Sequence, residues 1–429
     1  MKKMLFIICC LATIYSQAQN ADSVSAVAAQ YFKEAEQAAQ NQTLWNKPLY
    51  GPTLFVDPQS RMTWANMPDD KGVLKPDGKI YQGILPKDII IANTAISWQN
   101  KEWSVILWPL PKNHDERLNL VMHESFHRIQ ASLGLPSRSP TVNHLAAMEG
   151  RVYFLLELQA LKAALGKPVS QRKTDLTNAL LFREKRRRLF PATFGSERLL
   201  EMNEGLAEYT GVMLGRQKDS IRSHLYQVIN GADKTKSLIR SMAYTTGPVY
   251  GYLLFQKAPQ WTLQADSNSS FPALISKYYH LGPPTGDPDA KISRRLDLYG
   301  GEAIIAAEKL KDAEHRQLAD MYTELFTRKP ILTITSVDMR IGFNPSNLFD
   351  LGDLGTVYPT AEVKDAWGEI EVTETGMLMK DWKVIYLPIT GNTKLNEGSA
   401  EGAGWKLTLS PGWKIEKDGP VNYKVVKKE

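Results

Sequence analysis

The sequence predicts an α+β protein in which strand-rich segments lie on both sides of a long helical segment. Between about residues 45 and 110, short runs of β-branched and aromatic residues are separated by Pro, Asp and Gly, which is typical of strands joined by turns. From about residue 113 to 330, the apolar residues recur at helical spacing. Beyond this point short alternating runs return between Gly, Pro and Asn residues. We therefore expect a small all-β domain over residues 331–429.

The length and the charge balance limit what the chain can be. With 429 residues it exceeds what one hydrophobic core usually organises, so we expect one large domain, residues 20–330, before the β domain. Hydrophobic residues make up 43% of the chain and charged residues 23%, as in ordinary globular proteins. The formal net charge of +6 is small for this length. It does not indicate a nucleic-acid partner.

The first 19 residues have the pattern of a secretory signal peptide. Two lysines precede an apolar run over residues 4–15, and a small-x-small cleavage site ends at Ala18, before Gln19. Cleavage there would remove both cysteines, Cys9 and Cys10, and with them any thiol chemistry. A lipid anchor on one of these cysteines is the alternative. No later apolar run approaches the roughly 20 residues needed to span a membrane. We predict an exported protein, periplasmic or secreted, without an integral membrane segment.

The strand-rich segment follows an alanine-rich stretch, residues 21–41, that we expect to form a surface helix. Four runs of β-branched and aromatic residues are predicted strands: Thr53–Val56, Arg61–Trp64, Asp88–Ala92 and Trp103–Trp108. Prolines end the last of these runs, and Asn113 or Asp115 can cap the helix that follows.

The helical segment is expected to contain several long amphipathic helices. We predict them at Val142–Leu165, Asp175–Phe190, Ser196–Gly215, after the segment Arg240–Pro248 and at Glu302–Thr327. The second of these helices carries a basic cluster at residues 183–188. A solvated helix face is the favoured interpretation of this cluster, and a site for an acidic partner is the alternative.

The helix after Asn113 carries the sequence His-Glu-x-x-His at positions 123–127. Positions i and i+4 lie on the same face of a helix, so His123 and His127 can present two imidazole nitrogens to one metal ion. Glu124 lies beside them and can accept a proton from water on that ion. Two histidines, a third ligand, an open position and a carboxylate are the parts of a catalytic zinc site. The alternative is a purely structural pair of helical histidines.

A third ligand is needed, and the sequence offers two glutamates. Metzincins place a glycine three residues after the second histidine, but that position is Gln130, and no histidine follows until His144. Glu149 follows His127 at a spacing common among zinc peptidases that use a glutamate ligand. Glu204 lies farther along the chain. Spacing alone leaves both glutamates open.

The residues around Glu204 resemble a known family. The segment 203–209 reads Asn-Glu-Gly-Leu-Ala-Glu-Tyr, and it resembles the third-ligand helix of the gluzincins, the thermolysin-like clan, and especially that of the membrane alanyl aminopeptidases. The resemblance implies a zincin-like catalytic domain in which Glu204 binds zinc. Glu208, four residues later, would orient a histidine N–H group, and a surface carboxylate is the alternative. Glu149 remains the alternative ligand, or a residue that supports the ligands.

A second short motif adds to the resemblance. Tyr244 begins a Tyr-x-x-Gly sequence before an apolar helix, and in the same aminopeptidases this tyrosine stabilises the oxyanion. The resemblance implies that role for Tyr244, and a buried structural tyrosine is the alternative. The chain departs from the family in two respects. A longer segment separates the histidine and glutamate helices, and the Gly-x-Met-Glu-Asn signature is absent. Aminopeptidase specificity is therefore not expected.

These features together predict an exported zinc metallopeptidase, a hydrolase of the gluzincin type. Glu124 would accept the proton of a zinc-bound water that attacks the peptide carbonyl, and Zn²⁺ would be the cofactor. The substrate would be a peptide or protein, and Trp103–Trp108 is a candidate edge strand for its extended chain. One alternative is a zinc hydrolase of a non-peptide amide. Another is a non-catalytic zincin-fold binding protein whose β domain contacts a protein or a surface.

Overall fold

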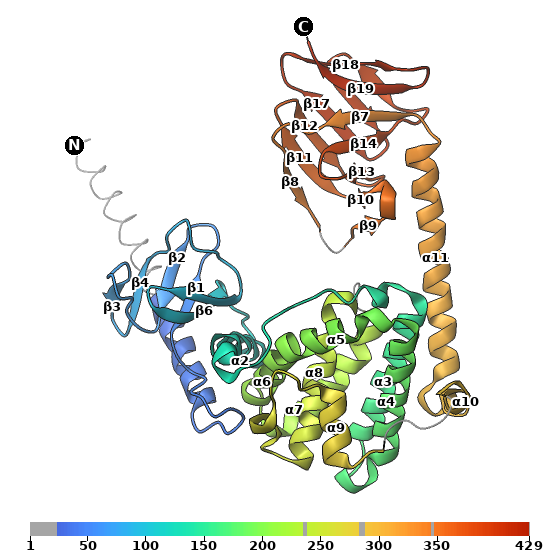
Figure 1. The fold of residues 1–429 in the computed structure, drawn as a ribbon. Coiled ribbons are helices and arrows are strands. Elements are labelled where there is room, and N and C mark those ends of the chain that lie inside the picture. Colours follow the sequence, from blue (N-terminus) through green and yellow to red (C-terminus); the bar gives the residue numbers. More distant parts are fainter. Residues whose placement is uncertain (1–23, 235–237, 283–287, 345–346, 429) are drawn as a thin grey trace, which may run out of the picture. The chain divides into compact units, whose positions relative to one another are not determined.

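The computed structural model describes residues 24–234, 238–282, 288–344 and 347–428 (Figure 1). The chain divides into two compact units, residues 1–305 and 306–429. The first unit contains one sheet and most of the helices, and the second contains mostly strands, so the predicted α+β class is confirmed. The segment interpreted as a signal peptide, with both cysteines, lies outside the described residues.

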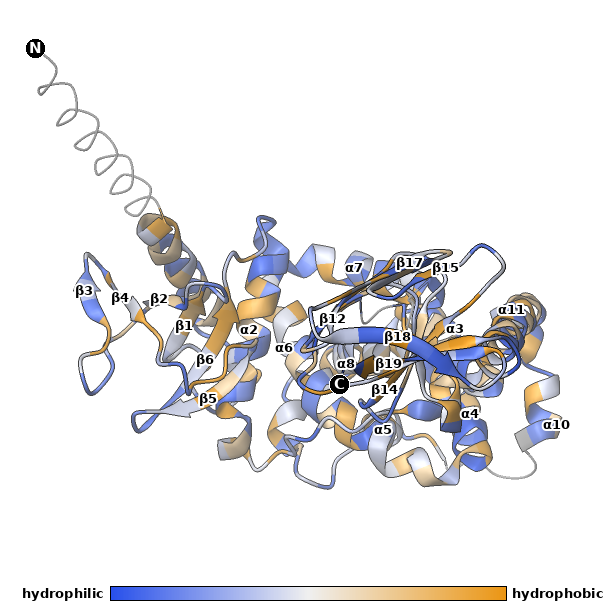
Figure 2. Ribbon diagram, turned by 90° about the horizontal axis from the view of Figure 1, so that it is seen from above, coloured by the Kyte–Doolittle hydropathy of each residue, from blue (hydrophilic) through white to orange (hydrophobic). Residues whose placement is uncertain are grey.

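The first unit begins with a helix over residues 24–39, which is followed by a six-stranded sheet. The strand order is β3-β4-β2-β1-β6-β5, in which β1 and β6 are parallel and the other neighbours are antiparallel. Four consecutive residues of β6 are buried, whereas β3 is largely exposed, and Figure 2 shows β6 as hydrophobic and β3 as hydrophilic. The strands are β1 (Thr53–Val56), β2 (Met62–Ala65), β3 (Lys75–Asp77), β4 (Ile80–Ile84), β5 (Thr94–Trp98) and β6 (Lys101–Leu107).

Two sequence-based expectations for this sheet are wrong. Residues 88–92 form no strand, because the guanidinium of Arg61 donates hydrogen bonds to the carbonyls of Leu85 (2.8 Å) and Ile89 (2.7 Å) and holds this segment as a loop. The segment Trp103–Trp108, expected at an edge, corresponds to β6, which pairs with β1 on one side and β5 on the other. Strand β5 is the edge strand.

Helix α2 (His114–Gln130) follows the sheet directly and carries the two histidines of the motif. Asn113 is its N-cap, and its side-chain oxygen accepts a hydrogen bond from the Glu116 backbone N–H at 3.1 Å. The first turn is acidic and the last turn basic, which suits the helix dipole. Val121, Met122 and Phe126 are almost fully buried in the main core. The motif helix is therefore held firmly on one face.

The remaining helices form most of the mass of the first unit, and α6 packs against α2 (Figure 1). The helical segment is continuous from α5 to α6 through one π-helical turn, Glu201–Gly205. The helices are α3 (Met148–Leu165), α4 (Lys173–Leu189), α5 (Phe194–Leu200), α6 (Leu206–Gly215), α7 (Lys218–Gly231), α8 (Leu238–Lys257), α9 (Phe271–Tyr279), α10 (Pro288–Ser293) and α11 (Gly301–Thr327), the last of which continues into the second unit.

The favoured interpretation of the basic cluster as a solvated helix face is wrong for two of its arginines. Arg183 and Arg186 are buried, with exposed fractions of 1% and 0%, and they pair with three buried glutamates. Arg183 donates to both oxygens of Glu201 (2.8 and 2.6 Å) and to Glu157 (3.1 Å). Arg186 donates to Glu157 (2.7 Å) and Glu197 (2.8 Å). Arg188 alone shows the expected pattern, since it is exposed and pairs with Glu184 at i−4.

Two hydroxyl groups of α8 join this buried charge network. Thr246 Oγ1 donates to Glu201 (2.7 Å), and the Tyr250 hydroxyl donates to Glu157 (2.6 Å). His144 also lies within hydrogen-bond distance of Glu197, at 2.7 Å. The network thus links α3, α4, α8 and the π-helical turn. A buried ion pair persists only where such additional hydrogen bonds compensate for lost hydration.

The second unit is a β-sandwich that includes the end of α11. Its two sheets have the orders β18-β19-β7-β14-β13-β10-β9 and β15-β16-β17-β12-β11-β8, and their inward residues share one core. Tyr322 and Phe326 of α11 pack against Phe349, Val357 and Leu378. This packing explains why the unit begins at residue 306, inside α11, whereas the sequence-based boundary lies at 331.

Strands make up most of residues 331–428, as expected for the C-terminal segment. The bounds are β7 (Ile331–Thr335), β8 (Arg340–Phe343), β9 (Phe349–Asp350), β10 (Thr356–Tyr358), β11 (Ala361–Asp365), β12 (Gly368–Val372), β13 (Met377–Lys380), β14 (Val384–Pro388), β15 (Lys394–Asn396), β16 (Ser399–Gly402), β17 (Trp405–Leu409), β18 (Trp413–Asp418) and β19 (Asn422–Lys427).

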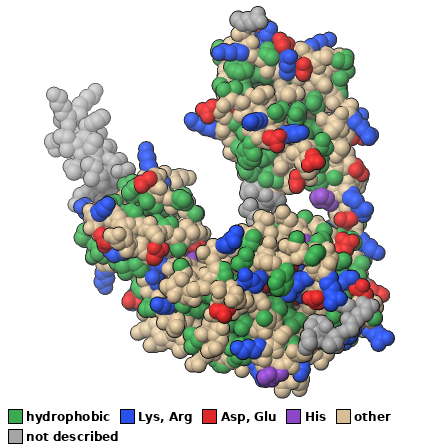
Figure 3. All heavy atoms as spheres, viewed as in Figure 1, with side chains coloured by type: hydrophobic (Ala, Val, Ile, Leu, Met, Phe, Trp, Pro, Cys, Tyr) green, Lys and Arg blue, Asp and Glu red, His purple; other side chains and the backbone are tan. Residues whose placement is uncertain are grey.

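The surface carries mixed charge. On the face shown in Figure 3, basic and acidic side chains are interspersed and not gathered by sign. Within the described ranges, no helix is both long enough and apolar enough to cross a membrane.

Candidate metal centre

Helix α2 brings the two motif histidines together. His123 and His127 stand one turn apart on the same face, and their Nε2 atoms are 3.2 Å from each other. The two rings meet nearly edge to face, with centroids 4.9 Å apart. His123 is buried, with an exposed fraction of 5%. The pair therefore points its nitrogens at one place and not at solvent.

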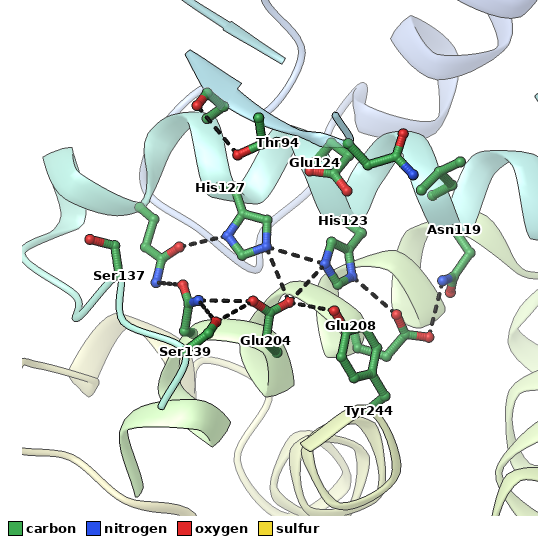
Figure 4. Close-up of a pocket in the computed structure, with 15 residues that line it drawn as sticks. Thr94, Asn119, His123, Glu124, His127, Ser137, Ser139, Glu204, Glu208 and Tyr244 are labelled. Atoms are coloured by element: carbon green, nitrogen blue, oxygen red, sulfur yellow. Dashed lines mark hydrogen bonds and ion pairs between the residues drawn. The ribbon is translucent and has the colours of Figure 1, made fainter. Parts of the chain in front are cut away.

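A carboxylate oxygen completes a triangle with the two histidines. Glu204 Oε2 lies 3.5 Å from His123 Nε2 and 3.6 Å from His127 Nε2 (Figure 4). A tetrahedral zinc ion holds nitrogen and oxygen ligands at about 2.0–2.1 Å, which places the ligand atoms roughly 3.4 Å apart. The three distances fit that geometry closely. The His123, His127 and Glu204 side chains thus form a group that could bind a metal ion.

Glu149, the other candidate ligand, is not part of this group. It lies in the first turn of α3 and is absent from the lining of the cavity around the histidines, as the described residues define that cavity. The structure therefore places Glu204, which the motif indicated, beside the histidines, and it places Glu149, which the spacing indicated, outside the group.

Close contacts between helix backbones hold Glu204 against α2. A Cβ atom added to Gly211 would lie 2.5 Å from the Asn119 carbonyl oxygen, and one added to Gly215 would lie 2.5 Å from the Asn119 nitrogen. Only glycine allows α6 to approach α2 this closely. Glu204 lies in the π-helical turn immediately before α6. Such turns are frequent at functional sites.

The outer nitrogens of both histidines have hydrogen-bond acceptors. His123 Nδ1 lies 3.1 Å from Glu208 Oε2, and His127 Nδ1 lies 2.8 Å from Gln130 Oε1. When the rings are neutral and each Nδ1–H donates outward, each Nε2 carries a lone pair that can bind a metal ion. Two such lone pairs and the Glu204 carboxylate therefore converge on one point. Three acceptors at these distances repel one another unless a cation lies between them, and this donor set fits a divalent metal ion.

The carboxylates beside the histidines favour a positive charge between the three candidate ligand atoms. Burial by itself lowers the pKa of His123, but hydrogen bonds with Glu204 and Glu208 outweigh burial and raise this pKa to about 10. Burial raises the pKa of Glu204, yet hydrogen bonds from both histidines, Ser139 and Tyr244 hold it well below its ordinary value. Both shifts show a centre that attracts positive charge.

The second oxygen of Glu204 is occupied by other partners. Glu204 Oε1 accepts hydrogen bonds from Ser139 Oγ (2.6 Å) and from Asn203 Nδ2 (2.9 Å). Gln130 Nε2 donates to Asn203 Oδ1 (2.8 Å), which joins the partner of His127 to the partner of Glu204. These bonds leave Oε2 as the oxygen that faces the histidines.

Sequence reasoning missed Ser139 and the roles of Gln130 and Asn203. Asn203 is part of the gluzincin-like motif, and Gln130 was used only to exclude the metzincin arrangement. Ser139 lies in a loop far from both motifs, and no local pattern indicates it.

Helix α8 places Tyr244 beside the candidate metal ligands. Its hydroxyl donates to Glu204 Oε2 at 2.6 Å, and its ring stacks on His123 with centroids 5.6 Å apart. The π-helical turn and α8 meet at two glycines, since a Cβ atom on Gly247 would lie 2.3 Å from Gly205 Cα. The glycine of the Tyr-x-x-Gly motif therefore permits the helix contact that sets Tyr244 beside the ligand.

Glu124 is a buried carboxylate with one oxygen that lacks a hydrogen-bond partner among the described residues. Its exposed fraction is 4%, and its Oε2 atom has no hydrogen-bond partner among the described residues. Burial raises the pKa of this carboxyl above its ordinary value, although the neighbouring histidines oppose that effect. An unpaired buried carboxylate oxygen is costly and usually indicates a function.

The group lies in a cavity of about 630 Å³. Edge strand β5 and the residue before it form one wall, helix α2 forms another, and the loop after α2 and the glutamate helix close the rest (Figure 4). The lining residues are Asn93, Thr94, Ala95, Asn119, Leu120, His123, Glu124, His127, Gln130, Ser137, Ser139, Asn203, Glu204, Glu208 and Tyr244.

The chain was compared with protein-family models, with curated proteins and with solved structures, and none of them matches.

Proposed function

We propose that this chain is an exported zinc metallopeptidase with a gluzincin-like site on a zincin-like fold. One observation carries the proposal: two histidine nitrogens and one glutamate oxygen form a triangle with sides of 3.2, 3.5 and 3.6 Å beside the unpaired carboxylate of Glu124. A purely structural site has no use for that carboxylate. Residues 1–19, with the pattern of a signal peptide, support export.

His123, His127 and Glu204 would hold the ion, and Zn²⁺ is the ion that this donor set favours. Two neutral imidazoles and one carboxylate are a known ligand set for catalytic zinc, which keeps one position open. When bound, zinc supplies a Lewis acid that lowers the pKa of water and polarises a carbonyl group.

Glu124 is the proposed proton carrier. Its side chain lines the cavity beside the ligands, and its free oxygen can accept a proton from the attacking water and return it to the leaving amine. Tyr244 is the proposed donor to the oxyanion. Its hydroxyl already lies 2.6 Å from the ligand oxygen, so a small rotation would turn it toward a substrate.

Strand β5 is the proposed support for the substrate chain. It is the edge of the sheet, and Thr94 and Ala95 line the cavity, so its free edge is next to the candidate ligands. An extended peptide could pair with this edge through main-chain hydrogen bonds. This assignment replaces the sequence-based choice of Trp103–Trp108, which lies in the interior of the sheet.

A peptide-library digestion with a matched variant tests the proposal. The zinc-loaded protein is expected to cleave peptides, and Glu124→Gln should lower the rate by about 10²–10⁴-fold while zinc content stays unchanged. Glu116→Gln makes the same change at an exposed position of α2 and should leave the rate as it is. Cleavage that survives in Glu124→Gln, or a zinc-loaded wild type that cleaves no peptide, would contradict the proposal.

A further inference from the structure

The ionisable groups of the cavity are few, and nearly all are already engaged. Among the described residues that line it, the ionisable side chains are His123, Glu124, His127, Glu204, Glu208 and Tyr244. The histidines, Glu204 and Tyr244 interact with one another. Both oxygens of Glu208 have partners, since Oε2 faces His123 and Oε1 accepts from Asn119 Nδ2 at 3.1 Å. Glu124 alone keeps a free oxygen, and the proposed reaction uses it.

The rest of the lining is neutral. Asn, Thr, Ser, Gln, Ala and Leu side chains make up the remaining wall, and no lysine or arginine contributes to it within the described part of the chain. Arg138 lies between two lining serines, Ser137 and Ser139, but it is exposed and is not itself part of the lining.

A chain terminus would meet a penalty in such a cavity. An α-ammonium group would need a spare carboxylate, and an α-carboxylate would need a cation, because an unpaired charge loses hydration that nothing replaces. An internal peptide bond brings no charge. It needs only main-chain partners, and the free edge of β5 supplies them.

The edge strand also extends beyond the cavity. Thr94 and Ala95 line the cavity, while β5 continues to Trp98. Five strand residues span about 17 Å. This length exceeds the 3.2–3.6 Å that separate the candidate ligand atoms of His123, His127 and Glu204. A bound chain can therefore continue past the reacting bond.

We propose that the cavity accepts the interior of an extended peptide and that the enzyme is an endopeptidase. This inference rests on the proposed peptidase function and adds the substrate class. The reaction consumes water and one internal amide bond, and it yields a new carboxylate and a new amine. Main-chain pairing with β5 and the absence of an end-binding charge together carry the assignment.

Four forms of one peptide test the inference. The peptide is made with free ends, with an acetylated N-terminus, with an amidated C-terminus and with both ends blocked, and products are identified by mass spectrometry. We expect cleavage at the same internal bond in all four forms, with kcat/KM values that agree to within a few-fold. A loss of more than about tenfold on blocking one end would overturn the inference and assign an exopeptidase.

Arg138→Ala provides a further check on the C-terminal end. It is expected to leave kcat/KM unchanged for all four forms. A decrease confined to the peptides with a free carboxylate would overturn the inference, because Arg138 would then bind the chain end. A zinc-loaded wild type that cleaves none of the four forms would overturn the proposed peptidase function, and this inference with it.

Discussion

The helical part of the first unit holds two clusters of three glutamates, and they differ in what neutralises them. In the first cluster, Glu157, Glu197 and Glu201 pair with Arg183 and Arg186, and every one of these side chains is buried. The second cluster consists of Glu124, Glu204 and Glu208, and its neighbours are two histidines. Unlike an arginine, a histidine can release its proton and bind a metal ion through the freed nitrogen.

The two clusters meet in one π-helical turn. Glu201 points to the arginines and Glu204, three residues later, points to the histidines. The first cluster carries its own cations, so it is complete without a ligand and its role is structural. The second cluster lacks a fixed cation among its described neighbours, so an external cation would complete it. In this chain the glutamates that arginines accompany form a structural network, whereas the candidate metal group lies where histidines take the place of arginines.

Breaking the arginine cluster should produce the largest change in stability. Arg186→Met leaves Glu157 and Glu197 without their main partner, and removing one member of a buried ion pair costs about 3–5 kcal/mol. The free energy of unfolding, measured with urea, should fall by that amount. Arg188→Met is the matched control on the same helix, and it should change stability by less than about 0.5 kcal/mol because Arg188 is exposed. Equal effects of the two variants would refute the distinction.

Separating the two helices at their glycine contact should affect both stability and metal binding. Gly247→Ala places a methyl group 2.3 Å from Gly205 Cα, so α8 must move away from the turn that carries Glu204. Overpacking of this kind costs about 1–3 kcal/mol. Thermal unfolding measures the loss, and zinc titration should show weaker binding.

Gly195→Ala is the control for this variant. A Cβ atom there meets nothing within 4 Å, and alanine suits helix α5 better than glycine does. We expect a small gain in stability and unchanged zinc affinity. If Gly247→Ala left the zinc affinity unchanged, the helix contact would not position the ligand.

Removing one partner of the ligand should produce the smallest effect. Ser139→Ala deletes the hydroxyl that donates to Glu204 Oε1, and the loss of a bond behind a metal ligand typically weakens metal binding by about 10–100-fold. Competition with a zinc chelator measures the dissociation constant. Ser137→Ala, two residues earlier in the same loop, removes a lining hydroxyl that Figure 4 shows without a bond to the ligands and should change the affinity little.

Local patterns predicted several of the long helices and the histidine pair, because helical spacing determines which side chains share a face. The choice of Glu204 came from the resemblance to the gluzincin motif, since spacing alone left Glu149 open. The sheet edge was predicted incorrectly because strand order depends on long-range pairing, which the strand sequences do not contain. The buried arginines were missed for a similar reason. Charge on a helix does not show which of its faces another helix will cover.

The contact between Gly205 and Gly247 and the hydrogen bond from Ser139 to Glu204 could not be predicted from the sequence, for a different reason. Gly205 and Gly247 are distant in sequence, and each looks like an ordinary helix glycine until the two backbones meet. Ser139 belongs to a loop whose path depends on the whole surrounding structure.

The zinc content of the purified protein tests the central claim most directly. The account predicts about one tightly held zinc ion per chain in the wild type, its loss in Glu204→Gln and its retention in Glu149→Gln. Glu149→Gln is the control because the same change is made in a glutamate outside the group. A wild type that holds no zinc, or a variant pattern in which Glu149→Gln loses the ion and Glu204→Gln keeps it, would contradict the account.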